Sequence, residues 1–334
     1  MAIEIMSKYQ KPKKSHKMDI IVISIVLILI GTSVGLFLFG LGDYEQLKNM
    51  QLTWTQIAEL ADADDPNAPQ EYIDENGDTI IVAETDQKDY LYRSINLAAL
   101  QEINPDTNGY IYIPNTEVNY PIMKETEPNV HFYLDHNFYK NSDKYGSIFE
   151  LCDEERGIPG IDNPINVIFG HHMASGAMFS GLYAYENQEF NTNPIFIYRD
   201  EYRVEYAVFA VCVVGQHDEV YDFSGFERDS DKYDQLLNRL VNESRVTCEA
   251  EKPSNDEDII ILSTCKGGAG TSLRLIVCAK EVRKVMVPEY YHSLEEVQQY
   301  GGESEAIDPF KENINQGGNS MQDIINSETT TENQ

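Results

Sequence analysis

The sequence predicts a mostly β domain with flanking helices, in which eight strands close into a barrel. Short apolar runs rich in Ile, Val, Tyr and Phe recur between residues 110 and 280, and turn-forming residues separate them. Few helical patterns stand between these runs, which favours a closed and mainly antiparallel barrel. The expected strands cover residues 110–113, 120–123, 147–151, 165–169, 195–198, 203–214, 259–263 and 273–280.

An apolar segment near the N-terminus predicts a transmembrane helix over residues 19–41. Residues 20–41 contain no charged side chain and match the ~20 residues that span a bilayer. Residues 1–18 carry five lysines and one glutamate, so the positive-inside rule places them in the cytoplasm and the rest of the chain outside the cell. A cleaved signal peptide and a buried core helix are the alternatives. The span is longer than the usual apolar region of a signal peptide and no clean cleavage site follows, so an uncleaved anchor is favoured.

Residues 42–90 are expected to form a helix, a linker and a hairpin outside the membrane. Apolar residues recur first at helical spacing, which predicts an amphipathic helix that packs on the barrel. These residues are Leu47, Met50, Trp54 and Ile57. An acidic linker is expected over residues 61–68.

Two β-branched runs around Asn76-Gly77 predict a β-hairpin. Asp74, Asn76 and Asp78 alternate as in a calcium-binding loop, but the glycine comes too early and the expected final glutamate is absent. The hairpin is therefore the favoured interpretation.

The main domain is expected over residues 91–287, followed by a polar, acidic and disordered tail over residues 288–334. A helix is predicted over residues 91–103, because apolar residues share one of its faces and Pro105 ends it. A further helix is predicted in the long connection 215–258, with Asp229 or Ser230 as its N-cap. Its apolar face is formed by Tyr233, Leu236, Leu237 and Leu240.

Composition argues against nucleic-acid binding and gives no sign of a cofactor. The net charge of -31 would repel a phosphate backbone. The five cysteines form no metal-ligand spacing, so no metal or cofactor is expected. Cys212 and Cys278 lie within apolar runs and are expected to be core residues. A disulfide that involves Cys152 or Cys248 stays open.

The strongest chemical signal is a cysteine at the end of an apolar strand. The run 259–262 continues into Ser263-Thr264-Cys265, and a Gly-rich connection leads to the next strand, which carries Arg274. A tight reversal between these strands returns Arg274 towards Cys265. A thiol and a guanidinium are therefore expected at one rim of the barrel.

A proton acceptor for this thiol is also present in the sequence. An unperturbed Cys titrates near pKa ~8.5, so a nucleophilic cysteine needs a base or a positive charge nearby. The apolar strand 165–169 ends at Gly170 and is followed by His171 and His172. Strand ends position side chains rigidly, so Cys265 and a histidine form a candidate catalytic set.

Together these residues resemble a known family. The Leu262-Ser263-Thr264-Cys265 run, the downstream Arg274 and the upstream Gly170-His171 are similar to the signature of sortases, the membrane-anchored cysteine transpeptidases of Gram-positive cell walls. The usual signature has Thr before the Leu, where this chain has Ile261. Further segments resemble the class B branch, and the resemblance covers about residues 92–287. These segments are 104–106, 109–111, 120–122 and 146–149.

The resemblance implies a role for each residue. Cys265 would attack the carbonyl of a Thr in a C-terminal sorting motif, His171 would act as general acid and base, and Arg274 would stabilise the oxyanion or the substrate. The position directly after Gly170 selects His171 over His172. Ser263 and Thr264 are candidates for substrate binding, with a local turn-stabilising bond as the alternative for either hydroxyl.

The implied partners are surface proteins that carry a sorting signal and an acceptor amine. That amine is expected on a peptidoglycan precursor, or on a pilin lysine if the enzyme polymerises pili. A papain-like protease is disfavoured, because there the cysteine precedes the histidine along the chain. A non-catalytic surface binding domain on the same fold remains the alternative from another functional class.

Overall fold

The computed structural model describes residues 47–63, 70–82, 89–125, 132–151, 163–221, 226–267 and 270–288, with a few isolated positions nearer the N-terminus. The expected cytoplasmic tail and acidic C-terminal tail lie outside the described residues. So does nearly all of the segment expected to span the membrane. Among the residues that are described, no helix is both long and apolar enough to traverse a bilayer.

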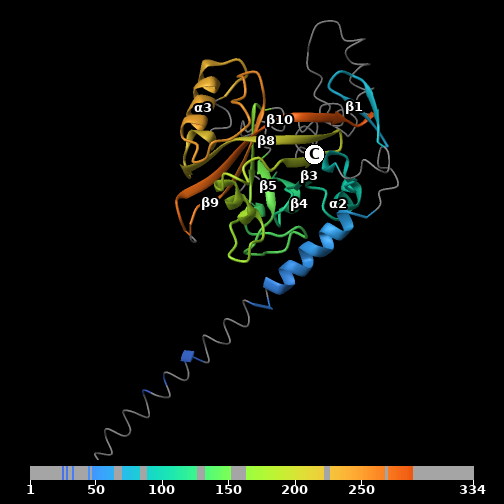
Figure 1. Cartoon of the computed structure of the whole chain (residues 1–334). Coiled ribbons are helices and arrows are strands. Elements are labelled where there is room, and N and C mark those ends of the chain that lie inside the picture. Colours follow the sequence, from blue (N-terminus) through green and yellow to red (C-terminus); the bar gives the residue numbers. More distant parts are fainter. Residues whose placement is uncertain are drawn as a thin grey trace, which may run out of the picture.

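Eight strands close into a barrel (Figure 1). Their spatial order is β10-β8-β7-β3-β4-β5-β6-β9, and β9 pairs with β10 to complete the circle. The pairs β4–β5 and β6–β9 are parallel and the others are antiparallel, which confirms the predicted closed and mainly antiparallel barrel. The strands are β3 (Thr107–Tyr112), β4 (Asn119–Glu125), β5 (Ile148–Leu151), β6 (Ile165–Phe169), β7 (Ile195–Tyr198), β8 (Tyr202–Gly215), β9 (Ile259–Cys265) and β10 (Leu273–Met286).

The expected hairpin is present as β1 (Glu71–Asp74) and β2 (Thr79–Ile81), and β1 pairs with the far end of β10. Gly77 takes a left-handed φ of 82°, which a glycine adopts without strain. The carboxylate of Asp74 accepts hydrogen bonds from the amides of Asn76 and Asp78, at 2.9 and 2.7 Å. The acidic side chain thus stabilises the turn itself.

The helix over residues 47–61 packs on the barrel as predicted. Met50, Trp54 and Ile57 are buried, and the Trp54 ring meets the edge of Tyr120 with 5.3 Å between centroids. This contact joins the N-terminal helix to β4, which lies in the middle of the sheet order.

The helix predicted over residues 91–103 is shorter than expected. It begins only at α2 (Leu97–Ile103), after a 3₁₀ turn η2 (Tyr90–Tyr92). The side chain of Asn96 accepts a hydrogen bond from the Ala99 amide at 3.0 Å and so caps the helix there. The prediction for residues 91–96 was wrong because the apolar periodicity extended past this cap.

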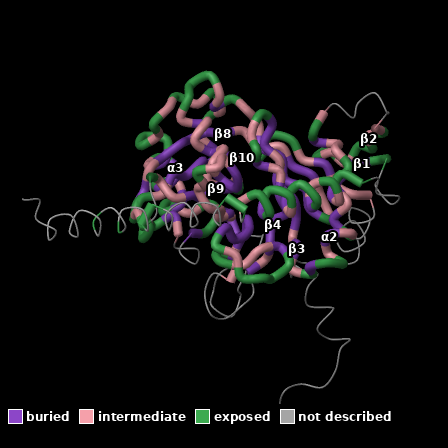
Figure 2. The backbone as a smooth tube through the Cα atoms, turned by 90° about the horizontal axis from the view of Figure 1, so that it is seen from below, coloured by how far each residue is buried: buried purple, intermediate pink, exposed green. Residues whose placement is uncertain are grey.

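Two apolar layers lie on the two faces of β9. Ile260 and Leu262 belong to the core inside the barrel, whereas Ile259 and Ile261 pack under α3 (Asp231–Asn242). The α3 helix begins where predicted, because the Ser230 hydroxyl accepts a hydrogen bond from the Tyr233 amide. Figure 2 shows the buried residues gathered along the strands. By alternation, Ser263 and Cys265 share the α3 face of the sheet.

Candidate active site

Strand register places Cys265 directly opposite Arg274 on β10. The Lys266 amide donates to the Leu273 carbonyl at 2.9 Å, so Cys265 and Arg274 form a pair without hydrogen bonds between them. Side chains in such pairs approach more closely than in hydrogen-bonded pairs and lie on the same face. The thiol and the guanidinium therefore share the α3 face at one end of the sheet.

His171 reaches the same place from the other side of β9. Strand β6 runs parallel to β9 with Phe169 opposite Ser263, and the Gly170 amide donates to the Ser263 carbonyl at 3.1 Å. His171 therefore follows the end of β6 that adjoins the Cys265 end of β9. The structure thus gathers Cys265, His171 and Arg274 at the adjoining ends of β6, β9 and β10.

Only glycine fits before the histidine. A Cβ at Gly170 would lie 2.4 Å from Cδ1 of Ile148 and 2.7 Å from Cδ2 of Phe179. The backbone is fixed again one residue later, since the His171 carbonyl accepts a hydrogen bond from the Phe179 amide at 2.9 Å. Close packing on both sides therefore sets where the chain leaves β6.

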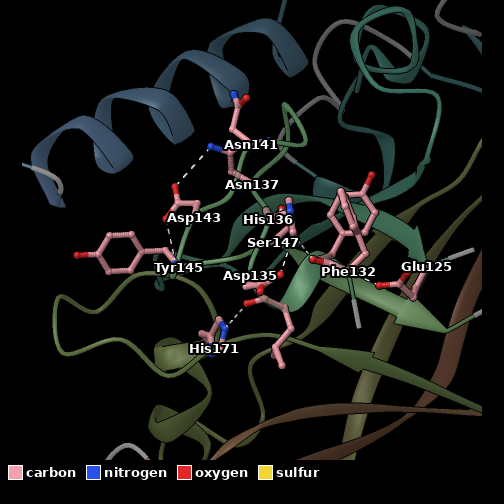
Figure 3. Close-up of polar contacts among 12 residues, drawn as sticks. Glu125, Phe132, Asp135, His136, Asn137, Asn141, Asp143, Tyr145, Ser147 and His171 are labelled. Atoms are coloured by element: carbon pink, nitrogen blue, oxygen red, sulfur yellow. Dashed lines mark hydrogen bonds and ion pairs between the residues drawn. The ribbon is translucent and has the colours of Figure 1, made fainter. Parts of the chain in front are cut away.

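The His171 ring is oriented by a backbone carbonyl. Its Nε2 lies 2.7 Å from the carbonyl oxygen of Leu134, in the 3₁₀ helix η3 (Phe132–Leu134) (Figure 3). A carbonyl oxygen can only accept, so Nε2 carries the hydrogen of this bond. In the neutral ring Nδ1 is then the unprotonated nitrogen, which can take a proton from a thiol.

The segment that carries Leu134 is itself anchored. The Tyr133 amide donates to the buried Glu125 carboxylate at 3.1 Å, and the Ser147 amide donates to the Tyr133 carbonyl at 2.9 Å. Gly146, which has a φ of 57°, packs against this segment. A Cβ at Gly146 would lie 2.6 Å from the carbonyl oxygens of Tyr133 and Leu134. Figure 3 shows this segment between Glu125 and His171. The Leu134 carbonyl thus has little freedom to move.

The Arg274 guanidinium is bound by backbone carbonyls of the residues just before it in the chain. Its Nη1 donates to the carbonyls of Thr271 and Leu273, at 2.8 and 3.0 Å. Tyr221, in η5 (Glu219–Tyr221), lies close enough for the Arg274 charge to affect it. Burial raises the pKa of Tyr221 to about 12, although a hydrogen bond with Ser263 and the Arg274 charge act in the opposite direction. Tyr221 therefore presents a neutral hydroxyl beside the site.

The two residues proposed for substrate binding are both buried. The Ser263 hydroxyl lies 2.8 Å from the Tyr221 hydroxyl, and only 2% of Ser263 is exposed. Thr264 is also 2% exposed and shares the barrel-facing side of β9 with Leu262. Neither hydroxyl reaches the surface in this conformation, so their role in substrate binding stays a prediction.

His172 faces a different element from His171. Its ring stacks on Tyr183 of the 3₁₀ helix η4 (Phe179–Glu186), with 4.3 Å between centroids and 20° between planes. Its Nδ1 lies 3.4 Å from the Gly267 carbonyl. The tandem histidines thus contact different elements. The choice of His171 for proton transfer stays a prediction, which rests on its position directly after Gly170.

The other described cysteines differ from Cys265 in their surroundings. Cys212 and Cys278 are fully buried, and burial raises the pKa of the Cys212 thiol to about 12. Burial also raises the pKa of Cys248. Cys265 lies partly exposed at a strand end, and all four thiols are free. Within the described ranges, no three His, Cys, Asp or Glu side chains are grouped so as to hold a metal ion.

Two contacts of the candidate site were not predicted from the sequence, those of the Leu134 carbonyl and the Tyr183 hydroxyl. Leu134 acts through its backbone, so its side chain carries no signal. Tyr183 contacts the turn after Cys265 through its hydroxyl, at a distance of 82 residues along the chain. Neither contact follows a local pattern.

Comparisons with known proteins identify the family of this chain. The family model for the sortase domain matches residues 111–282, which include all three candidate catalytic residues. Sortase B from Listeria monocytogenes is 32% identical over 173 residues, which cover 51% of this chain and 66% of that protein. Sortase B from Staphylococcus aureus is 29% identical over 189 residues, which cover 55% of this chain and 74% of that protein.

A solved structure shows the same fold. A mutant form of sortase B from Clostridium perfringens aligns with a TM-score of 0.52 and 23% identity, covering 69% of this chain and 97% of that one. The chain spans just under two thirds of the length of the Listeria relative. Because the family model matches just over half of the chain, the chain belongs to the sortase family, and the relatives it resembles are sortase B proteins.

Proposed function

We propose that this protein is a sortase B-like cysteine transpeptidase. The observation that carries the proposal is the meeting of Cys265, His171 and Arg274 at three adjoining strand ends. A thiol, an imidazole and a guanidinium on one rim can supply the nucleophile, the proton carrier and the oxyanion donor for acyl transfer through a thioester. Membership of the sortase family supports the same chemistry.

In the first half-reaction Nδ1 of His171 takes the thiol proton, and the Cys265 sulfur attacks the carbonyl carbon of the motif's Thr. The Thr peptide bond breaks, a thioester forms, and the leaving amine takes the proton back from His171. The Leu134 carbonyl keeps the ring in the tautomer that this transfer needs. General acid and base catalysis of this kind contributes about 10²–10⁴-fold.

Arg274 supplies positive charge where the tetrahedral intermediate develops an oxyanion. Its guanidinium starts from bonds to two carbonyls of its own turn, so it exchanges part of these for the substrate. A backbone N–H near Cys265 is proposed as a second donor to the oxyanion. The Lys266 amide does not fit this role, because it donates to the Leu273 carbonyl.

In the second half-reaction an amine attacks the thioester, passes its proton to His171, and releases Cys265. A cell-wall peptide is the acceptor proposed here, with surface proteins that bear a C-terminal sorting signal as substrates. A pilin lysine is the alternative acceptor. We further propose a single-pass anchor over residues 19–41 with the N-terminus in the cytoplasm, which the apolar span and the preceding lysines support.

The full chain in detergent micelles provides the test. It is incubated with a panel of fluorogenic sorting peptides and either a wall-peptide amine or a pilin-derived lysine peptide. The expected product joins the motif's Thr to the wall-peptide amine, and Cys265→Ala forms none. Cleavage that persists in Cys265→Ala would contradict the nucleophile, whereas peptide binding without turnover in the wild type would favour a non-catalytic surface domain.

A further inference from the structure

The Tyr183 side chain links the backbone of Cys265 to that of Gly267, on either side of Lys266. Its hydroxyl donates to the Cys265 carbonyl at 2.9 Å and accepts from the Gly267 amide, also at 2.9 Å. Between these two contacts, the Lys266 amide donates to the Leu273 carbonyl across the ladder. Three consecutive residues that leave the end of β9 are thus each restrained.

The Tyr183 ring is held in place by two neighbours. His172 stacks on it with centroids 4.3 Å apart, and the Lys266 ammonium lies 4.3 Å from its centroid. An ammonium over an aromatic ring is attracted by the negative face of the ring. Lys266 also forms an ion pair with Glu186, which binds Arg245 as well. The ring therefore has a defined position from which its hydroxyl reaches the turn.

We propose that Tyr183 is a positioning residue for the transpeptidation reaction. Its hydroxyl fixes the peptide units after Cys265 and thereby the direction in which the Cys265 thiol leaves the sheet. The proposal rests on the function proposed above, since it assumes that Cys265 is the nucleophile. A misplacement of about 1 Å at a reacting group can cost on the order of 10²-fold in rate, so such a tether affects turnover directly.

The proposal also assigns a role to His172. Its ring packs against the tyrosine that restrains the nucleophile's turn, while His171 faces the Leu134 carbonyl. The two adjacent histidines then have different roles in one site. His171 moves the proton, and His172 supports the residue that positions the sulfur.

A matched control lies two residues away in the same 3₁₀ helix. The Tyr185 hydroxyl also donates to a backbone carbonyl, that of Asn193 at 3.0 Å, but this contact is with the segment before β7. Tyr183→Phe and Tyr185→Phe thus each remove one hydroxyl from η4. Only the first removes it from the turn after Cys265.

The test measures peptide turnover and Cys265 alkylation on the full chain in micelles. Iodoacetamide is the probe, and peptide mapping follows the rate of Cys265 labelling as a function of pH. Tyr183→Phe is expected to lower kcat about tenfold with little change in KM, and to alter the rate or pH dependence of Cys265 labelling. Tyr185→Phe should leave both activity and labelling as in the wild type.

Two outcomes would overturn the proposal. One is a Tyr183→Phe protein with wild-type kcat and wild-type labelling. The other is an equal loss in both tyrosine variants, which would indicate a general effect of weakening η4. If the wild type turns over no sorting peptide, the proposed function fails, and the labelling comparison still decides whether Tyr183 positions the Cys265 sulfur.

Discussion

The two sides of the candidate active site are held in different ways. Cys265 and Arg274 are direct partners in a continuous antiparallel ladder, so backbone pairing sets the spacing of their Cα atoms. His171 lies two residues beyond the end of β6, and its ring is oriented by the Leu134 carbonyl from a separate segment. The nucleophile side therefore depends on strand register, whereas the histidine side depends on the segment between β4 and β5.

A buried ion pair supports the histidine side of the site. Strand β5, which follows the Leu134 segment, carries Glu150, whose side chain is fully buried against Arg199 with contacts of 2.7 and 2.8 Å. Asn166 of β6 donates to the same carboxylate at 3.0 Å. One carboxylate thus links the strand after the Leu134 segment to the strand that leads to His171.

The largest effect on kcat/KM is expected when one of the tandem histidines is replaced, and it should differ between the two. His171→Ala should lower kcat/KM by about 10²–10⁴-fold, because it removes the proton carrier. His172→Ala should lose far less, since His172 packs against Tyr183 and contacts the Gly267 carbonyl but carries no proton in the proposed reaction. Steady-state kinetics with a sorting peptide and an amine measure both. A larger loss in His172→Ala would reverse the assignment.

The next effect concerns stability. Arg199→Met should lower the free energy of unfolding by about 3–5 kcal/mol, because it leaves a buried carboxylate without its partner. Urea denaturation at neutral pH measures this. A loss below about 1 kcal/mol, the value of a surface pair, would show that Glu150 is not buried as described.

The pH dependence of the stability difference between the wild type and Arg199→Met provides a control for this prediction. Although burial alone would raise it, the pKa of Glu150 lies below its ordinary value, because Arg199 and the amides of Asn108 and Asn166 stabilise the carboxylate. Its contribution is therefore present above pH ~4.5 and is lost as the pH falls through the folded-state pKa. In Arg199→Met burial should instead raise this pKa, so the stability gap to the wild type should narrow on acidification.

A glycine substitution tests the histidine side alone. The Cβ of Gly146→Ala would press on the Leu134 carbonyl, so the His171 ring should lose its orientation and kcat should fall about 10–100-fold. Gly176→Ala is the matched control, because Gly176 also has a positive φ but no atom lies within 4 Å of its Cβ position. Iodoacetamide labelling of Cys265 should remain possible in both proteins. Equal kinetic losses in the two variants would argue against the role of Leu134.

The smallest effect is expected on the nucleophile side. Tyr221→Phe removes the hydrogen bond to Ser263 and should cost about 1 kcal/mol of stability. Because strand register holds Cys265 and Arg274, kcat should change little. Thermal unfolding and peptide kinetics on the same preparation measure the two quantities. A large kinetic loss with unchanged stability would place Tyr221 in the reaction itself.

Much of the fold was predictable because local patterns dominate it. All eight barrel strands were expected near their observed positions, and Asn76-Gly77 marked the hairpin turn. The helix α3 followed from its apolar spacing and its Ser230 cap. The start of α2 was missed because one side-chain bond from Asn96 outweighed the apolar periodicity before it.

The candidate site was predictable only where residue types carry the chemistry. Cys265, His171 and Arg274 follow strand ends and resemble a family signature, so their meeting was expected. The Leu134 carbonyl and the Tyr183 hydroxyl act on them through tertiary contacts, 37 and 82 residues away along the chain. No local pattern marks a backbone acceptor or a tether of this kind.

Trapping of the acyl intermediate tests the central claim most directly. The full chain is mixed with a sorting peptide in the absence of an acceptor amine, quenched in acid, and mapped by mass spectrometry. The account predicts a thioester on Cys265 that a wall-peptide amine discharges, and none in Cys265→Ala. An acyl group on another residue, or an adduct that persists in Cys265→Ala, would contradict it.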